Sequence, residues 1–295
     1  MEKNMDYKLI FCDVDGTLID KDHNLSDANK NAIKKATDAG IQFVLCSGRT
    51  PVSLVDIAGN IGVASPYVVG FNGGTIWNTK TNQTLQSQAL PTAVAKDLLQ
   101  EVEAFSHVQN AVGYKSEYLR PGEGHVVAPI CFGVYVSPDH IILQSNGPQT
   151  GTVIDDKVKI TRSTSDIAKL VNNDVLKIIM FGSREQLDDI LYTMEPKLKG
   201  RADMYYTNTH LLEFVPKGTN KGQGITWLAN HLGVTLGQTI AIGDNYNDIE
   251  MIKTAGLGIA TANAVAPLKE VADHITTADH NNNAVTEAIE YILNK

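Results

Sequence analysis

The chain has 295 residues, of which 43% are hydrophobic and 20% are charged, a composition typical of a globular protein with a sizeable core. Its net charge is −8 and its basic residues form no block, which argues against nucleic acid or an anionic membrane as its partner. Its three cysteines lack CxxC spacing, and it shows neither a signal-peptide pattern nor a long apolar run, so we expect a cytoplasmic protein with reduced thiols.

A short apolar run, Leu9–Cys12, ends abruptly in Asp13 and Asp15, which are followed by Gly16. Apolar runs bounded by turn residues are typical of buried parallel strands, and ligands of open parallel sheets bind at the carboxyl ends of the strands. Two carboxylates about 5 Å apart repel each other by ~3 kcal/mol at an effective dielectric constant of about 20. The stretch therefore predicts a cation there, most simply a divalent metal that prefers oxygen ligands. A solvated Asp-Gly turn is the alternative.

Each of the next two predicted strands also ends in small or polar residues. Residues 41–46 run into Ser47-Gly48-Arg49, and residues 67–71 run into Asn72-Gly73-Gly74. Helices are expected between these strands. The alternation predicts an α/β fold, with a doubly wound parallel (Rossmann-like) sheet whose functional edge is built from the strand ends.

The two expected helices have recognisable ends. Ser26 can cap a helix that begins near Asp27 and stops at Gly40, and Thr50 followed by Pro51 is typical of the start of the second helix. The first helix should present a modest apolar face to the sheet. This face consists of Ala28, Ala32, Ile33 and Ala36.

The pattern changes after the third strand. Residues 75–90 alternate around the turn Lys80-Thr81-Asn82, as a β-hairpin would. Between residues 91 and 216, helical and β-rich stretches are interrupted by glycine and polar clusters. We therefore predict an inserted α+β domain at residues 86–215, with the core domain formed by residues 1–85 and 216–295.

The alternation of strands and helices returns near residue 221. The first and last thirds of the chain therefore look like one sheet that is split by the insertion. The expected helices are residues 221–232, 249–255 and Ala284–Leu293, and the expected strands are residues 239–242, Leu257–Ala260 and 274–277.

Asp244 and Asp248 repeat the pattern of Asp13 and Asp15, because they too lie just beyond a short apolar strand. The four acids converge if the two strands are adjacent in the sheet. A site so rich in carboxylate oxygen suits Mg²⁺ better than Zn²⁺. A helix cap at Asp244-Asn245, with Asp248 in the first turn, is the structural alternative.

Lys221 opens its predicted helix, where a cation is disfavoured by up to ~1 kcal/mol. Residues 218–222 are rich in small side chains, which let a ligand approach the backbone amides. A lysine beside helix N-terminal amides suits an anion such as phosphate, and a solvated surface lysine is the alternative. Ser47-Gly48 offers a similar hydroxyl and amide before a helix, although Ser-Gly is also common in ordinary loops.

Together these groups are suited to phosphoryl transfer. One carboxylate can attack phosphorus and form an acyl phosphate, while a second protonates the leaving oxygen and later activates water. A metal, a lysine and backbone amides can neutralise the equatorial oxygens. The expected partner is a small phosphorylated metabolite.

Four ordered blocks resemble the haloacid dehalogenase-like hydrolase superfamily, and within it the Cof-type phosphatases. The blocks are Asp13-Val-Asp-Gly-Thr-Leu18, Ser47-Gly-Arg49, Lys221-Gly222 and Gly243-Asp-Asn-Tyr-Asn-Asp248, and Asn72-Gly73-Gly74 and Glu213-Phe-Val-Pro216 look like subfamily markers. The resemblance implies a large α/β cap between the second and third blocks. Residues 260–263 and 277–284 depart from the family pattern.

The resemblance implies a Mg²⁺-dependent phosphatase that acts on a sugar phosphate or a cofactor- or nucleotide-like phosphate, with a cap that selects the substrate. It implies Asp13 as nucleophile, Asp15 as general acid and base, and Lys221 as a catalytic residue on the phosphate. The phosphate would also contact Ser47, Gly48 and Asn247. The metal would be held by the Asp13 carboxylate, the Asp15 backbone carbonyl and Asp244, with Asp248 in support, and candidate substrate contacts are Arg49, Asn72 and Gly73.

Two other functions compete with hydrolysis. A phosphotransferase or phosphomutase would use the same core, whereas a phospho-ligand-binding regulator would not need a nucleophile and an acid together. In the inserted domain, several residues are either substrate contacts or ordinary surface and packing residues. They are His107, His125, His140, His210, Arg120, Lys177, Arg184 and Arg201.

Overall fold

A computed structural model describes residues 6–62, 65–111, 116–120, 124–128, 130–144, 157–164, 166–198, 200–208 and 210–294. The chain forms two compact units: unit 1 comprises residues 1–87 and 220–295, and unit 2 comprises residues 88–219. The second boundary lies four residues later than the one drawn from the sequence. The reason is that Lys217 and the Gly218 amide both bond to the Asp203 carboxylate of unit 2.

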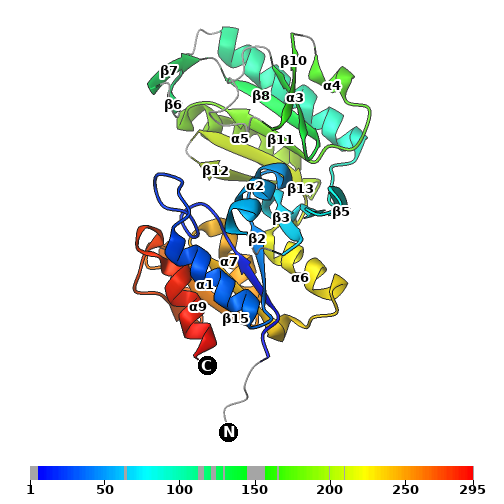
Figure 1. The fold of residues 1–295 in the computed structure, drawn as a ribbon. Helices are drawn as coiled ribbons and strands as arrows, with labels where there is room; N and C mark the ends of the chain where they lie inside the picture. The colour runs from blue at the N-terminus through cyan, green and yellow to red at the C-terminus, as the bar shows by residue number, and fades with distance from the viewer. Residues whose placement is uncertain are drawn as a thin grey trace. The chain divides into compact units, whose positions relative to one another are not determined.

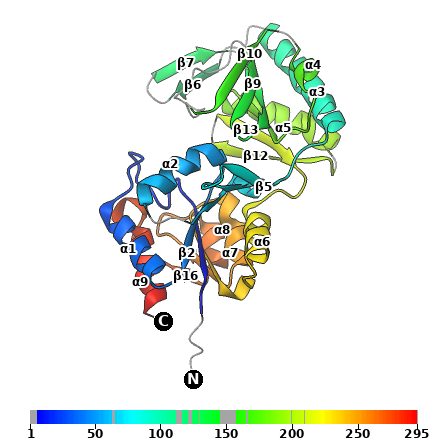
Figure 2. The same ribbon diagram turned by 45° about the vertical axis from the view of Figure 1, so that its right-hand side comes forward.

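Unit 1 is built on an eight-stranded sheet in the order β16-β15-β14-β1-β2-β3-β4-β5 (Figures 1 and 2). The strands from β16 to β3 are parallel, and β4 and β5 add an antiparallel hairpin at the edge. The central strand β1 pairs with β14 on one side and with β2 on the other. The strands are β1 (Leu9–Cys12), β2 (Gln42–Cys46), β3 (Tyr67–Gly70), β4 (Thr75–Asn78), β5 (Gln83–Ser87), β14 (Thr239–Gly243), β15 (Leu257–Ala260) and β16 (His274–Ile275).

Helices cover both faces of this sheet, which confirms the predicted α/β core. Helices α1, α2 and α9 pack on one face with Ile10 and Cys12 of β1, and α6, α7 and α8 pack on the other with Leu9 and Phe11. Because both faces are buried, the central strands are continuously apolar. The helices are α1 (Asp27–Asp38), α2 (Pro51–Ile61), α6 (Lys221–His231), α7 (Ile249–Thr254), α8 (Ala266–Val271) and α9 (Ala284–Leu293), with short 3₁₀ turns η1 (Phe71–Gly73), η2 (Leu236–Gln238), η3 (Tyr246–Asp248) and η4 (His280–Asn282).

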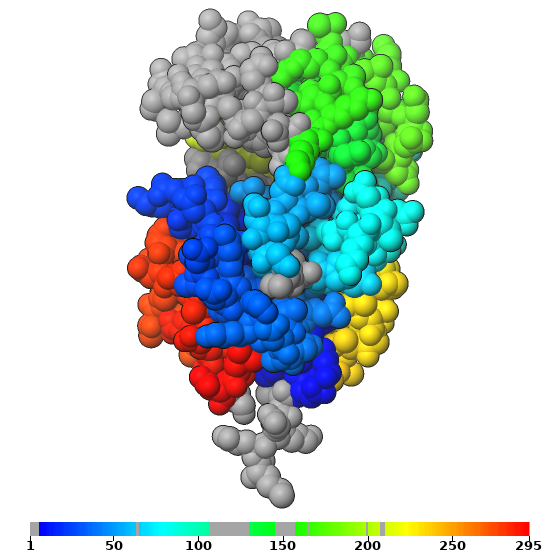
Figure 3. Space-filling view, in the orientation of Figure 1, coloured from blue at the N-terminus to red at the C-terminus, as the bar shows by residue number. Residues whose placement is uncertain are grey.

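Helix α1 differs from its predicted apolar face at one position. Ser26 caps the helix by accepting a hydrogen bond from the Asn29 amide, but Ala28 is exposed and Asn29 is buried instead. Asn29 Nδ2 donates to the Leu18 carbonyl oxygen, and Asn29 Oδ1 accepts from Thr286 at the start of α9. The two helices, blue and red in Figure 3, therefore lie side by side.

Strand β3 ends one residue earlier than predicted because the chain leaves the extended conformation. Phe71 (φ 50°), Asn72 (φ 53°) and Gly73 (φ 92°) are three successive residues with left-handed backbones. Gly70 immediately precedes them and contacts the Pro51 ring of α2 so closely that a Cβ there would lie 2.7 Å from the proline Cδ. This turn connects β3 to the hairpin of β4 and β5.

Unit 2 contains a six-stranded sheet in the order β10-β9-β8-β11-β13-β12 and a separate β6-β7 hairpin. Helices α3 (Thr92–Ala111), α4 (Ile167–Leu170) and α5 (Arg184–Leu198) form a hydrophobic core with one face of the larger sheet. The strands are β6 (Ser116–Arg120), β7 (Gly124–Ala128), β8 (Cys131–Ser137), β9 (His140–Gln144), β10 (Lys159–Ser163), β11 (Lys177–Phe181), β12 (Ala202–Asn208) and β13 (Leu211–Pro216). None of the helices in the described part of the chain has the length and apolarity needed to cross a bilayer.

A buried ion pair lies on the other face of the unit 2 sheet. Lys177 Nζ is 2.6 Å from Glu213 Oε1, and the ammonium also lies 5.3 Å from the centre of the Tyr135 ring. Glu213 Oε2 is buried without a hydrogen-bond partner among the described residues. The pair therefore places one charge of each sign inside unit 2.

The remaining polar candidates in unit 2 make ordinary contacts. Two arginines form exposed ion pairs, and two histidines lie within hydrogen-bonding distance of neighbouring residues. The contacts are Arg184 with Asp188, Arg201 with Asp97, His140 with Thr161 and His210 with the Gly182 carbonyl. The side chains of His107, Arg120 and His125 lie outside the described part of the chain.

Candidate active site

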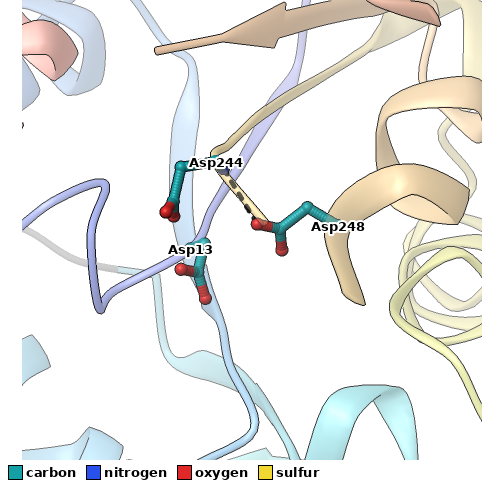
Figure 4. A group of neighbouring side chains, drawn as sticks. All are labelled: Asp13, Asp244 and Asp248. Carbon is teal, nitrogen blue, oxygen red and sulfur yellow. Dashed lines mark hydrogen bonds between the residues drawn. The ribbon is translucent and has the colours of Figure 1, made fainter. Parts of the chain in front are cut away.

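The ends of β1 and β14 bring three carboxylates together (Figure 4). Asp13 follows β1, Asp244 and Asp248 follow β14, and one oxygen of each lies within 4.8 Å of the others. The two acidic stretches meet because β1 and β14 run parallel, with Cys12 opposite Ile242, so that both strands end at the same edge of the sheet. All three side chains are buried or nearly so.

Asp248 is held by the protein on both of its oxygens. Its Oδ2 accepts hydrogen bonds of 2.9 Å from the backbone amides of Asp244 and Asn245, and the first of these is the dashed line in Figure 4. Its Oδ1 lies 2.5 Å from Lys221 Nζ. Asp248 therefore fixes the loop after β14, which leaves Asp13 and Asp244 as the more available carboxylates.

Lys221 lies at the start of α6 and is fully buried, so it is not a solvated surface lysine. Its Nζ is 2.5 Å from Asp13 Oδ1 and 2.5 Å from Asp248 Oδ1. Burial alone lowers the pKa of a lysine, but here Asp13 and Asp248 outweigh burial and raise the pKa of Lys221 above its usual value. The side chain is therefore an ammonium ion that bridges two carboxylates.

The three carboxylates and the Lys221 ammonium carry a formal charge of −2 in a buried site. Burial raises the pKa of Asp13 well above its usual value, although Lys221 opposes this shift. Burial and then Asp248 raise the pKa of Asp244 to about 6, against the hydrogen bond from Thr17. A divalent cation would balance this charge, and carboxylate oxygens are its preferred ligands when it is Mg²⁺. The donor set fits Mg²⁺.

The turn after Asp13 fits closely against Asp244. Thr17 Oγ1 donates a 2.7 Å hydrogen bond to Asp244 Oδ1, a contact that the sequence reasoning missed although Thr17 lies inside the first block. Gly16 has φ +82°, and a Cβ there would lie 2.5 Å from Asp244 Oδ2, so only glycine fits. Asn263 Nδ2 donates to the Gly16 carbonyl oxygen at 2.8 Å. The atypical segment 260–263 thus supports this turn.

The Asp15 carboxylate is engaged outside the acidic cluster. Arg49 Nε donates to Asp15 Oδ2 at 2.7 Å and Arg49 Nη2 donates to Asp15 Oδ1 at 2.6 Å, which is the bidentate geometry of a strong pair. Both side chains are partly exposed, unlike those of the cluster. Two aspartates that look equivalent in the sequence therefore occupy different environments.

Four further candidates gather at the ends of β2, β3 and β14. Ser47 is buried, and its Oγ accepts a hydrogen bond from the backbone amide of Arg49. Asn247 Nδ2 donates to Asn72 Oδ1 at 2.9 Å, and a Cβ on Gly48 would lie 3.1 Å from Asn72 Nδ2. Residues 47, 48, 72 and 247 therefore come together although they are far apart in the sequence.

Comparison with known proteins identifies a family. The family model of haloacid dehalogenase-like hydrolases matches residues 10–289. A crystal structure of a haloacid dehalogenase-like hydrolase from Bacteroides thetaiotaomicron is 26% identical and superposes with a TM-score of 0.76, covering 97% of this chain and 99% of that chain. The resemblance seen in the sequence blocks is thereby confirmed.

Two curated relatives align along most of the chain. The 5-amino-6-(5-phospho-D-ribitylamino)uracil phosphatase YwtE of Bacillus subtilis is 28% identical over 97% of this chain and 98% of its own length. An HMP-PP phosphatase of Yersinia pseudotuberculosis is 27% identical over 90% of this chain and 87% of its own length. The chain also matches the chloroplastic endoribonuclease YBEY of Arabidopsis thaliana at 26% identity, but it spans only 46% of that protein's length.

Proposed function

Because the chain belongs to the haloacid dehalogenase-like hydrolases, we propose that it is a Mg²⁺-dependent phosphatase that works through an aspartyl-phosphate. Relatives aligned along most of the chain are named as phosphatases of small phosphorylated compounds, so this chain is a phosphatase of small phosphorylated metabolites. The observation that carries the proposed mechanism is the buried group of Asp13, Asp244 and Asp248 beside the Lys221 ammonium.

Asp13 is the proposed nucleophile. One of its carboxylate oxygens attacks phosphorus, the bond from phosphorus to the leaving oxygen breaks, and an aspartyl-phosphate forms. The 2.5 Å bond from Lys221 to Asp13 Oδ1 supports this role, because it fixes the direction of the carboxylate at the end of β1. Attack of water on phosphorus then returns the Asp13 carboxylate and releases inorganic phosphate.

Asp15 is the proposed acid and base. It gives a proton to the leaving oxygen in the first step and takes one from water in the second. Its position outside the buried cluster and its partial exposure support this role, because the carboxylate is not bonded to the other groups of the cluster. Arg49 occupies both Asp15 oxygens, so Asp15 has to leave Arg49 before it can donate a proton.

Mg²⁺ would be held by the carboxylates of Asp13 and Asp244 and by the Asp15 backbone carbonyl, while Asp248 anchors the loop. The metal, when bound, neutralises negative charge on the phosphate oxygens. Lys221 supplies a second positive charge. Ser47, the Gly48 amide and Asn247 supply hydrogen-bond donors to the phosphate. Their shared position at the strand ends supports this assignment.

Unit 2 is proposed to act as a cap that selects the leaving group, since lids exclude water and commit the substrate. Its core is separate from that of unit 1, which supports a distinct role. We also assign the protein to the cytoplasm, because its three cysteines are buried free thiols, as in proteins of reducing compartments.

Hydrolysis of p-nitrophenyl phosphate tests the proposal. We expect release of nitrophenol with Mg²⁺, no release with excess EDTA, and no release by Asp13→Asn with Mg²⁺. Asp27→Asn is a matched control, because Asp27 is an exposed residue in the first turn of α1, and it should retain full activity. Persistent turnover by purified Asp13→Asn would show that another residue is the nucleophile.

A further inference from the structure

The turn after β3 has an unusual backbone. Phe71, Asn72 and Gly73 all have positive φ, and two of these residues carry a side chain. Left-handed backbones are unfavourable for residues other than glycine, and they persist only where the surroundings hold them in place. Asparagine tolerates this conformation better than most residues. Contacts between the turn and its surroundings must therefore stabilise this backbone conformation.

Backbone contacts tie the turn to two elements of the proposed phosphate site. The Phe71 amide donates to the Arg49 carbonyl and the Asn72 amide donates to the Ser47 carbonyl, each at 2.9 Å. On the other side, a Cβ on Gly73 would lie 2.1 Å from the carbonyl oxygen of Asn220, the N-cap residue of α6. The turn thus packs between the loop after β2 and the start of the helix that carries Lys221.

The Asn72 side chain adds a third connection. It is only 3% exposed, its Oδ1 accepts the 2.9 Å bond from Asn247 Nδ2, and its Nδ2 lies against Gly48. This contact uses one of the two N–H groups of the Asn247 amide, so it sets the direction of the other N–H group.

We propose that Asn72 is a positioning residue of the phosphate site, which holds the Asn247 amide in the geometry that binds phosphate. The inference rests on the proposed function, which assigns Asn247 to the phosphate. Asparagine meets two requirements at this position: its backbone accepts the left-handed turn and its side chain orients Asn247. Glycine meets only the first, so Asn72→Gly removes the contact without adding backbone strain.

The test is a double-mutant cycle on binding of inorganic phosphate in the presence of Mg²⁺. Affinity is measured by calorimetry and as competitive inhibition of p-nitrophenyl phosphate hydrolysis, for wild type, Asn72→Gly, Asn247→Ala and the double variant. We expect each single variant to weaken phosphate binding about tenfold, the scale of one hydrogen bond to a charged group. The double variant should bind within twofold of Asn247→Ala, because Asn72 acts through Asn247.

Asn82→Gly is the matched control. Asn82 also has a left-handed backbone (φ 56°), but it lies exposed in the turn between β4 and β5. It should bind phosphate as wild type does. Losses that multiply in the double variant, or an Asn72→Gly protein with wild-type affinity, would overturn the inference. A wild-type protein that neither binds phosphate nor hydrolyses the ester would instead overturn the proposed function, and the inference with it.

Discussion

The Asp244→Asn variant isolates the free-energy cost of a charged Asp244 in the acidic cluster. In the metal-free protein, burial and then Asp248 raise the pKa of Asp244 from 3.8 to about 6. Asparagine keeps an oxygen that can accept the Thr17 hydrogen bond, but it carries no charge and does not titrate. The pH dependence of the difference between wild type and variant therefore reports the Asp244 charge, including its effect on Asp13.

The sign follows from the proton count. Between pH 3.8 and about 6, folded Asp244 keeps a proton that the unfolded chain has released, so stability falls as the pH rises through this range. A shift of about 2 pH units corresponds to about 3 kcal/mol. The penalty is absent below pH ~4 and is complete above pH ~6.

Urea unfolding with EDTA, followed by tryptophan fluorescence, measures this penalty. Both tryptophans, Trp77 and Trp227, belong to unit 1, so the signal follows the unit that contains Asp244. Relative to Asp244→Asn, the wild-type unfolding free energy should fall by about 3 kcal/mol between pH 4 and pH 7. A difference between the two proteins that does not change with pH would refute the reasoning.

Magnesium should reverse the effect. At pH 7.5 and a free Mg²⁺ concentration of 100 times its dissociation constant, wild type should gain about 2.7 kcal/mol. Below pH 6 the proton on Asp244 competes with the metal, so the gain should shrink as the pH falls. Asp244→Asn should gain much less at every pH. An equal gain in both proteins would exclude Asp244 as a ligand.

Further substitutions test three other contacts. Lys221→Met leaves two buried carboxylates unpaired and should cost about 3–5 kcal/mol in urea unfolding, together with loss of phosphatase activity. Glu213→Leu alone should destabilise unit 2 by a similar amount, because it leaves the Lys177 charge buried, whereas Lys177→Met with Glu213→Leu should recover most of the loss in thermal unfolding. Gly16→Ala should weaken Mg²⁺ binding at least tenfold in calorimetry, because its Cβ would collide with Asp244 Oδ2. Wild-type stability of Lys221→Met or of Glu213→Leu alone would contradict the ion pair that the substitution breaks, and wild-type Mg²⁺ binding by Gly16→Ala would contradict the close fit of Gly16 against Asp244.

Much of the fold could be predicted because its signals are local. The Ser26 cap, the Thr50-Pro51 helix start and the continuous apolar strands each depend on neighbouring residues only. The meeting of Asp13 with Asp244 was predictable too, since parallel strands place their carboxyl ends at one edge of the sheet. The sequence could not show how close the acids come.

The separate environments of the acids could not be predicted. By pattern, Asp13 and Asp15 look equivalent, yet Asp15 pairs with Arg49, which lies 34 residues further along the chain. Asp248 accepts from two backbone amides and from Lys221, and these contacts depend on the packing of η3 against α6. The burial of Asn72 could not be predicted either, because spacing alone does not show whether a side chain is buried.

The order of the strands in unit 1 sets the order in which a nascent chain can fold. Strand β1 leaves the ribosome first, but its partner β14 begins only at Thr239. Unit 2 is one continuous stretch of chain, residues 88–219, and it is complete before β14 is made. The sheet that begins with β1 and β2 therefore keeps an unpaired edge at β1 while the whole insertion is synthesised. The acidic cluster can be assembled only after Asp248 has emerged.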